Sequence, residues 1–349
     1  MRKPTAPITS PLNVYKALPK VELHRHLEGS LRLQTMLEIA HAHGITIPDN
    51  ILRLSGMVQV QDEDPLTFQN FLAKFNTLRL FYRSPDVIHR VTREAVEDAA
   101  RDNVKYMELR FTPVALSRAE RFPLHDVMNW VCTSAADAAE EFDIQVRLIA
   151  SVNRHESPEL AEQVAWLAAA HIERGIVGMD LAGNEAEFSA MPFVGLFREA
   201  KQAGLCLTIH AGEWAGAENV REAVEDLGAE RIGHGVRVME DEDVVALARE
   251  RGTTFEVCPT SNYQSGVVPA LSDHPLPRMM QAGLNVTVNT DDPSVSRIDL
   301  SHEFKLAHED LGLPMDVLKE RVLAAAQAAF LPDDEREKLV GELEKELKK

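Results

Sequence analysis

The chain of 349 residues contains few cysteines and no long apolar run. Its three cysteines, Cys132, Cys206 and Cys258, lie far apart, and no CxxC pair occurs. This spacing argues against a disulfide framework and against a thiolate zinc site. The apolar stretches fall well short of the roughly 20 residues that a membrane-spanning helix needs. The segment Met1–Leu12 has early cations but no apolar core, so we expect no secretory signal and a cytoplasmic protein.

Positive charge is also scarce. The 37 Lys and Arg residues are outnumbered by 55 Asp and Glu residues, which gives a formal net charge of −18. Such a surface repels phosphate backbones and anionic membranes, so we expect neither nucleic acid nor a membrane as a partner. A neutral small molecule such as a nucleoside is still compatible with this charge, because a small pocket responds to local charge rather than to the total.

Short apolar segments alternate with longer helical patterns along the whole chain. Eight strands are predicted, at Val21–Leu27, Lys105–Phe111, Gln145–Ser151, Val177–Ala182, Leu205–His210, Arg231–Val236, Thr253–Pro259 and Asn285–Asn289. Helices are predicted between most of them, at Pro85–Asp102, Leu124–Phe142, Pro158–Arg174, Pro192–Ala203, Ala217–Leu227 and Glu240–Arg251. Strand followed by helix, eight times, predicts a parallel sheet with right-handed crossovers.

Eight such units in roughly 250 residues favour an α/β fold of the (β/α)8 TIM-barrel type. The alternative is a doubly wound open sheet, but the chain has no glycine-rich dinucleotide fingerprint and no Walker A sequence. We therefore predict a single barrel domain over residues 1–349. About 80 residues separate the first two strands, and they include Phe68–Arg83. Because a plain barrel loop is far shorter, we expect extra helices over the active-site mouth. The charged tail Glu335–Lys349 is predicted to be a solvated helix.

The first predicted strand carries two histidines on one face. Side chains alternate across a strand, so Glu22, His24, His26 and Glu28 share a face opposite the apolar residues. The apolar face should meet the helices, which leaves the polar set pointing into the barrel. Two imidazoles side by side are either hydrogen-bonded core histidines or the start of a metal site.

Other strand ends favour the metal site. His210 ends the fifth strand, His234 lies at the end of the sixth, and Asp291 and Asp292 follow the eighth. In a TIM barrel, the catalytic groups come from these carboxyl ends of the strands. We therefore predict a metal site made of His24, His26, His210 and Asp291. Nitrogen and oxygen ligands without thiolate suit zinc better than iron or manganese. A single metal ion is predicted, because the fourth strand lacks the lysine that bridges two metals in many barrel hydrolases.

Three further residues are candidates for catalysis or substrate binding. Glu213 follows His210 by three residues and can deliver a proton, although it could also be a surface residue at the start of a helix. His234 can orient a hydroxide, or it can support the ligands from behind. Asp292 can bond the substrate, or it can cap the helix that starts at Pro293.

Motifs along nearly the whole chain resemble those of the adenosine deaminase family. Each motif is weak alone, but their order and their positions at strand ends are specific. The matching segments are Pro19–Gly29, Asp180–Glu185, His210–Glu213, Gly233–Gly235, Cys258–Asn262 and Asn289–Pro293.

The resemblance implies hydrolytic deamination of adenosine, and also of 2′-deoxyadenosine, with one zinc per chain. It implies that Glu213 protonates the purine nitrogen next to the reacting carbon, while His234 and Asp291 align the attacking hydroxide. Asp292 would then bond the imidazole-ring nitrogen of the purine, and the Gly183 amide would bond the other ring edge. The ligand His26 also borders the substrate.

Glu28 departs from the family pattern. Adenosine deaminases usually have Asp at this position, near the ribose, and relatives that act on free adenine commonly have Glu. In contrast, the segment Phe71–Phe75 is similar to the lid of adenosine deaminases. The resemblance therefore favours adenosine as the substrate. Adenine, or a modified adenine nucleoside such as aminodeoxyfutalosine, is the alternative.

Two other classes of function can be tested against these expectations. A metal-dependent amide or ester hydrolase on a similar barrel would need a second metal or another proton carrier. A non-catalytic nucleoside-binding or growth-factor-like relative would be expected to have a broken ligand set or a secretory signal, and the sequence has neither feature.

Overall fold

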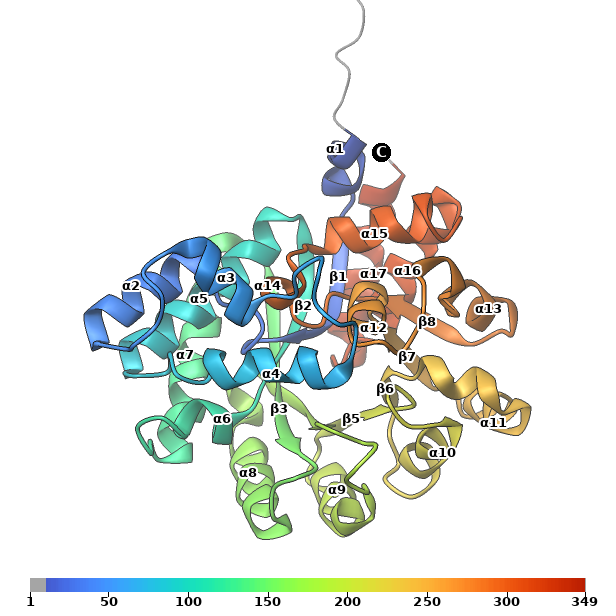
Figure 1. Cartoon of the computed structure of the whole chain (residues 1–349). Helices are drawn as coiled ribbons and strands as arrows, with labels where there is room; N and C mark the ends of the chain where they lie inside the picture. Colours follow the sequence, from blue (N-terminus) through green and yellow to red (C-terminus); the bar gives the residue numbers. More distant parts are fainter. Residues whose placement is uncertain (1–10, 349) are drawn as a thin grey trace, which may run out of the picture.

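The protein, described here from a computed structural model of residues 11–348, is a parallel barrel surrounded by helices (Figure 1). Its eight strands pair in chain order. They are β1 (Lys20–His26), β2 (Val104–Phe111), β3 (Gln145–Asn153), β4 (Ile176–Ala182), β5 (Cys206–Ala211), β6 (Arg231–His234), β7 (Thr254–Val257) and β8 (Asn285–Val288).

The barrel closes between β1 and the residues that follow β8. A parallel bridge joins Arg25 to Asp291. The His26 amide donates to the Asp291 carbonyl over 2.8 Å, and the Asp291 amide donates to the His24 carbonyl over 2.9 Å. This closure confirms the predicted (β/α)8 barrel and excludes the open sheet. It also fixes Asp291 beside the two histidines of β1.

All eight predicted strands are present, but β6 and β7 are shorter than predicted. A short 3-10 helix begins at Val236, so β6 ends at His234. Pro259 starts the helix α12 (Pro259–Gln264), and β7 therefore ends at Val257. Proline favours the first turn of a helix and cannot donate to a strand ladder, which explains the second difference.

The outer helices follow the predicted order. Ser84 caps α5 (Pro85–Arg101), where its side chain accepts from the Val87 amide. Gly252 ends α11 (Glu242–Arg251) in the left-handed conformation. The helix predicted over Pro158–Arg174 is split, since α8 ends at Ala170 and a 3-10 turn follows. The helices around the barrel are α5 (Pro85–Arg101), α7 (Leu124–Phe142), α8 (Pro158–Ala170), α9 (Val194–Gln202), α10 (Ala217–Glu225), α11 (Glu242–Arg251), α13 (Leu276–Gln281), α15 (Leu300–Glu309) and α16 (Met315–Gln327).

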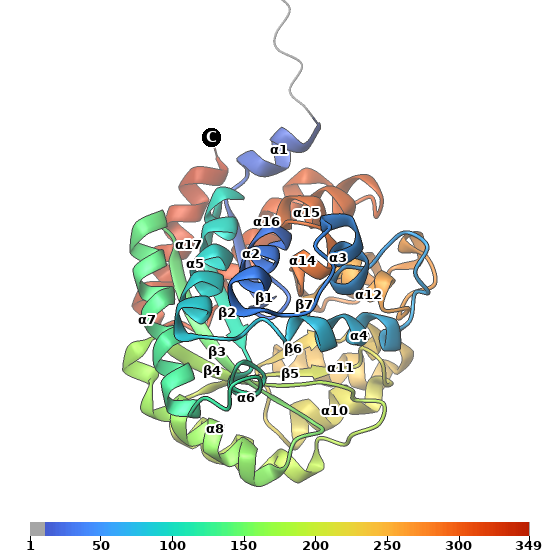
Figure 2. The ribbon, with the colours of Figure 1, turned by 60° about the vertical axis from the view of Figure 1, so that its left-hand side comes forward.

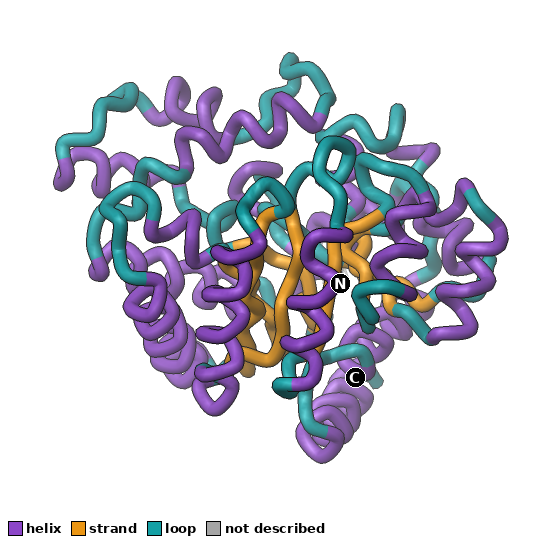
Figure 3. Tube along the Cα trace, turned by 90° about the horizontal axis from the view of Figure 1, so that it is seen from below, coloured by secondary structure: helices purple, strands orange, loops and turns teal. Residues whose placement is uncertain are grey.

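The long connection after β1 forms extra helices, as predicted. They are α2 (Leu33–His43), α3 (Ile51–Val58) and α4 (Phe68–Leu78), and they precede α5. Helix α4 crosses one end of the barrel in both ribbon views (Figures 1 and 2). Seen from the side, the strands lie at the centre, with further helices across that end (Figure 3). The short helices are α1 (Pro11–Ala17), α6 (Pro113–Ser117) and α14 (Pro293–Ser296).

The final helix, α17 (Asp333–Leu347), corrects one expectation. It was predicted to be a solvated helix, but it packs against α16 and buries Leu339, Leu343 and Leu347. The four-residue spacing of these leucines gives one apolar stripe among many charges. Lys349 lies outside the described residues. Across residues 11–348, none of the helices combines the length and the apolar character needed to cross a bilayer.

Candidate active site

Strand β1 points two imidazoles into the carboxyl end of the barrel. His24 is fully buried, while His26 is slightly exposed towards the mouth. Their rings lie 5.3 Å apart between centroids. The period-two alternation of a strand places both on the inner face, as the sequence predicts.

Two strand ends bring further ligand atoms to the same point. The Nε2 atoms of His26 and His210 are 3.3 Å apart. Asp291 Oδ1 lies 3.2 Å from His24 Nε2 and 3.4 Å from His26 Nε2. Asp291 has a φ of 67°, a left-handed conformation that is uncommon for a residue with a side chain. All four predicted ligands therefore converge in the structure.

Two buried carboxylates fix the orientation of the imidazoles. His24 Nδ1 is 2.8 Å from Glu256 Oε2, and His210 Nδ1 is 2.8 Å from Asp180 Oδ1. A carboxylate accepts the Nδ1 proton, so the lone pair of each Nε2 faces the cluster. His24 Nε2 is buried without a hydrogen-bond partner. Several acceptor atoms facing one another need a cation between them, and these residues therefore fit a metal ion.

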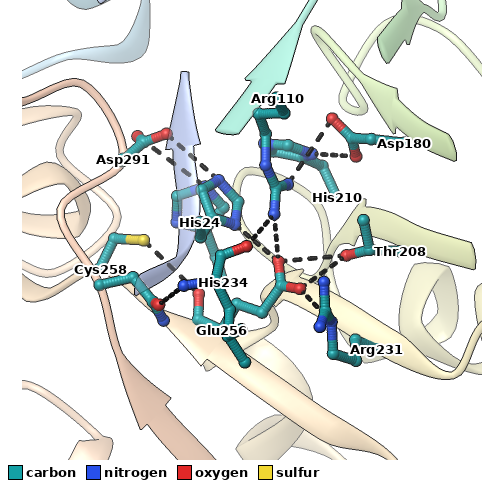
Figure 4. A network of polar contacts seen from close by, with 12 residues as sticks. His24, Arg110, Asp180, Thr208, His210, Arg231, His234, Glu256, Cys258 and Asp291 are labelled. Atoms are coloured by element: carbon teal, nitrogen blue, oxygen red, sulfur yellow. Dashed lines mark hydrogen bonds and ion pairs between the residues drawn. The ribbon is translucent and has the colours of Figure 1, made fainter. Parts of the chain in front are cut away.

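Glu256 is itself held by a buried ionic network (Figure 4). It accepts from Arg110 Nη2 over 2.8 Å, and its other oxygen is 2.6 Å from Arg231 Nε. The Thr208 hydroxyl lies 3.1 Å from both oxygens. These charges hold the pKa of Glu256 well below its ordinary value, although burial alone would raise it. An ionised Glu256 is a strong acceptor for His24. Glu256 is not among the site residues predicted from the sequence.

His234 lies next to the cluster with its proton directed into the pocket. Its Nδ1 is 3.0 Å from the Asn262 amide nitrogen, and the Asn262 oxygen lies 3.2 Å from His274 Nε2. Nδ1 therefore accepts, and the proton is on Nε2. Burial lowers the pKa of His234, so the ring stays neutral.

The position of the proton separates His234 from the ligands. Its Nε2 is 3.6 Å from Glu213 Oε1 and 3.9 Å from Asp291 Oδ2. Ligand atoms of His24, His210, His234 and Asp291 all lie within 4.8 Å of one another, and His26 groups with His210 and Asp180. Because a protonated nitrogen cannot coordinate a metal, His26 is the better third imidazole.

Glu213 lies in the loop after β5 and is buried. Burial, together with the charges of Asp291 and Glu185, raises its pKa well above the ordinary value. A protonated carboxyl can therefore face the pocket at neutral pH. Glu185 holds this loop in place by accepting from four successive amides, those of residues 212–215, over 2.6–3.0 Å. Glu185 is not among the site residues predicted from the sequence.

Asp292 lines the pocket and does not cap the helix that follows it. It precedes α14 without a side-chain cap bond, and its Oδ1 is buried without a partner. Burial and the charges of Asp291 and Glu28 raise its pKa well above the ordinary value. Gly29 makes room for this side chain, since a Cβ at Gly29 would lie 1.8 Å from Asp292 Oδ1.

Glu28 is buried at the other side of the pocket. One carboxylate oxygen accepts from the Thr112 amide over 2.6 Å, and the second has no partner. Burial raises the pKa of Glu28 to about 7, although the Thr112 bond lowers it. The free oxygen is therefore available to a bound molecule.

These groups line one cavity that is open to solvent. It is bounded by all the predicted site residues except His24, and Gly183 contributes backbone with a φ of 92°. Helix α4 covers the cavity with Phe71, Leu72 and Phe75. Phe68 of α4 stacks on Trp214, with ring centroids 5.3 Å apart, which ties the helix to the loop that carries Glu213.

Comparisons with known proteins agree with this geometry. The model of the family described as "Adenosine deaminase" matches residues 19–346. The adenosine deaminase of Salmonella schwarzengrund is 36% identical over 323 residues, which cover 92% of this chain and 96% of that protein. The adenosine deaminase of Shewanella loihica is 34% identical over 324 residues, which cover 93% of this chain and 97% of that protein.

Three solved structures are similar over nearly the whole chain. The adenine deaminase of Arthrobacter aurescens has a TM-score of 0.88 and 30% identity, and the match covers 95% of this chain and 100% of that one. A zinc-bound amidohydrolase from Burkhoderia ambifaria has a TM-score of 0.88 and 28% identity, covering 99% and 96%. The Arabidopsis N6-mAMP deaminase has a TM-score of 0.85 and 27% identity, covering 95% and 99%.

Proposed function

The chain belongs to the adenosine deaminase family, and on that premise we propose that it converts adenosine and 2′-deoxyadenosine to the corresponding inosines and ammonia. It is a hydrolase that acts on C–N bonds. The observation that carries the proposal is the convergence of His24, His26, His210 and Asp291 beside a buried Glu213 in one pocket.

His24, His26, His210 and Asp291 would hold one zinc ion. Three imidazoles and one carboxylate suit zinc. Carboxylates already hold the outward Nδ1 atoms of His24 and His210, and the Ser261 hydroxyl donates to Asp291 Oδ2. When bound, the ion supplies the acidity that makes water a nucleophile near neutral pH. The rest of the mechanism concerns groups of the chain itself.

Glu213 would hold and deliver the proton. As a protonated carboxyl, it donates to the purine nitrogen next to the carbon that carries the amino group. The electrons of that C=N bond move to the nitrogen as the oxygen of water bonds to the carbon. The C–N bond to the amino group then breaks as the C=O bond forms. Ammonia leaves with one of the two water protons, and the other water proton returns to Glu213.

His234 and Asp292 would set the geometry of attack. The Nε2 proton of His234 faces Glu213 and Asp291, so it can donate to the incoming oxygen and hold it in line. Asp292, with its raised pKa, can donate to the imidazole-ring nitrogen of the purine. The Gly183 amide bonds the opposite ring edge, and its positive φ turns the backbone towards the cavity.

Ammonia release from a panel of adenosine, 2′-deoxyadenosine and adenine tests the proposal. We expect zinc-loaded protein to prefer the nucleosides. Glu213→Gln should lower kcat/KM by about 100- to 10,000-fold because it removes the proton donor, with zinc content unchanged. The exposed Glu218→Gln on α10 serves as the matched control. Absence of ammonia from every member of the panel would refute the proposal.

Adenine is the second candidate substrate, because Glu28 occupies the side of the pocket expected to receive the sugar. Its longer side chain, compared with Asp, places a free carboxylate oxygen there. The similar protein from Arthrobacter aurescens is an adenine deaminase. If adenine were preferred over adenosine in the same panel, the substrate assignment would change and the proposed proton transfer would stay the same.

A further inference from the structure

Arg79, at the carboxyl end of α4, lines the active-site cavity without a partner for its charge. Only its backbone amide is bonded, to α4 carbonyls. Within residues 11–348, its guanidinium makes no hydrogen bond and no ion pair within 4.0 Å. Burial and the charge of Arg118 lower the pKa of Arg79, whereas the charge of Glu28 raises it. Because no carboxylate of residues 11–348 lies within ion-pair distance of this half-buried guanidinium, it is free to pair with an anionic group of a ligand.

A second cavity adjoins the first at this arginine. It is open to solvent and lies between the lid helix α4 and the loops after β3 and β4. Leu72, Arg79, Asn153 and Gly183 line both cavities. None of the proposed metal ligands borders the outer one. The space available to a substrate therefore extends from the inner cavity past Arg79 and Gly183 into the outer one, and Arg79 lies near enough to Glu28 for the two charges to interact.

The other charged groups near Arg79 leave it available to an anion. Arg118 is already within 3.8 Å of Glu156. Glu28 acts on Arg79 through its charge but lies beyond ion-pair distance. His155 and Glu187 line only the outer cavity, and both are solvent-exposed. Arg79 is thus the one arginine or lysine that lines both cavities.

We propose that Arg79 binds a phosphate or a carboxylate carried by the substrate beyond its sugar. This proposal rests on the proposed function, because the adenine ring must occupy the inner cavity for the sugar substituent to reach the outer one. The planar guanidinium forms paired hydrogen bonds to either anion, which a neutral nucleoside does not offer. Adenine nucleosides with an anionic 5′ extension are then a further substrate class of the same site.

The test compares three substrates in wild type and in Arg79→Met, which keeps length and loses charge. The substrates are adenosine, adenosine 5′-monophosphate and adenosine 5′-carboxylate. A hydrogen-bonded charge is worth about 10- to 100-fold in affinity. For at least one anionic substrate, Arg79→Met should therefore lower kcat/KM by about 10- to 100-fold more than for adenosine. The substrate with the larger loss identifies phosphate or carboxylate.

Two variants and one binding measurement complete the test. Arg79→Lys should retain part of the preference, because it keeps the charge but loses the paired geometry. Glu187→Gln is the matched control in the outer cavity and should not reduce the preference. Calorimetry with inosine 5′-monophosphate, inosine 5′-carboxylate and inosine reports binding without turnover.

The outcomes separate this proposal from the proposed function. Weaker binding of an anionic ligand by Arg79→Met, with inosine binding retained, supports the proposal. Equal loss for all substrates, or no loss for either anionic ligand in both assays, overturns it. Failure of every substrate to release ammonia would overturn the proposed function, while calorimetry would still report on Arg79.

Discussion

At the residue scale, the site depends on which nitrogen of each imidazole carries the proton. Glu256 and Asp180 hold the Nδ1 protons of His24 and His210, which leaves acceptor atoms at the centre of the cluster. The Asn262 amide group instead donates to Nδ1 of His234, so Nε2 of this ring carries the proton and acts as a donor. A small set of hydrogen bonds thereby divides similar histidines into ligands and one orienting group.

Asp180→Asn should weaken zinc binding by about 10- to 100-fold. The amide is a weaker acceptor for the His210 Nδ1 proton, so the ring is less well oriented and less basic. Competition with a chelator measures the affinity, and circular dichroism checks the fold. Asp126→Asn, whose solvent-accessible side chain lies in the first turn of α7, is the control. Unchanged zinc affinity in Asp180→Asn would contradict the proposed orienting role.

The pH profile should reflect the protonation of Glu213. Its pKa is raised by burial and by the charges of Asp291 and Glu185, and a proton donor works only while protonated. We therefore expect kcat/KM for adenosine to be retained below that pKa and to fall as pH rises through it. Steady-state rates across the pH range measure this effect. A rate that kept rising throughout the alkaline range would argue against Glu213 as the donor.

Sequence patterns could predict which side chains face the interior of the barrel, but not which residues contact and orient them. The alternation in β1 and the position of His210 at the end of β5 are visible in the sequence, because strand period and strand direction determine where they point. Glu256 contacts His24 across the barrel, and Arg79 reaches the pocket from a lid helix. Such contacts depend on tertiary packing, and no local spacing encodes them.

At the element scale, the lid is fixed to the catalytic loop. Phe68 of α4 stacks on Trp214, the residue after Glu213. Phe68→Ala should raise KM for adenosine by about 3- to 10-fold, with a smaller change in kcat, because an aromatic pair helps to hold the lid closed. Steady-state kinetics separate the two constants. The control is the exposed Leu52→Ala on α3. A loss confined to kcat would contradict this role.

The terminal helix α17 provides a second test at this scale. Leu343 is 1% exposed against α16, so Leu343→Ala should lower the free energy of unfolding by about 2–5 kcal/mol. Glu344→Ala, on the solvated side, should change it much less. Urea denaturation followed by circular dichroism measures both. Equal stability of the two variants would restore the expectation that α17 is only a solvated helix.

Element boundaries were predicted less well than element order. The charge density of α17 concealed its leucine stripe, which is apparent only when 339, 343 and 347 are placed on one helical face. The strands β6 and β7 ended early because Val236 and Pro259 begin helical turns. At these two positions the local preference for a helical turn outweighed the apolar character from which the longer strands were predicted.

At the scale of the whole molecule, barrel closure creates the site. The ligands come from β1, β5 and the end of β8, which are distant in sequence, and the bridge between Arg25 and Asp291 brings the first and last of them together. Repetition of strand and helix predicted this architecture. The position of α4 over the mouth followed only in outline from the length of the first connection.

Zinc content and ammonia release, measured on the same preparation, test the central claim most directly. Protein stripped by a chelator and reloaded with zinc should bind one ion per chain and regain deamination of adenosine in proportion to that occupancy. The His210→Ala variant should bind less zinc and show a parallel loss of activity. Full activity in stripped protein, or activity that requires two ions per chain, would contradict a single-zinc aminohydrolase.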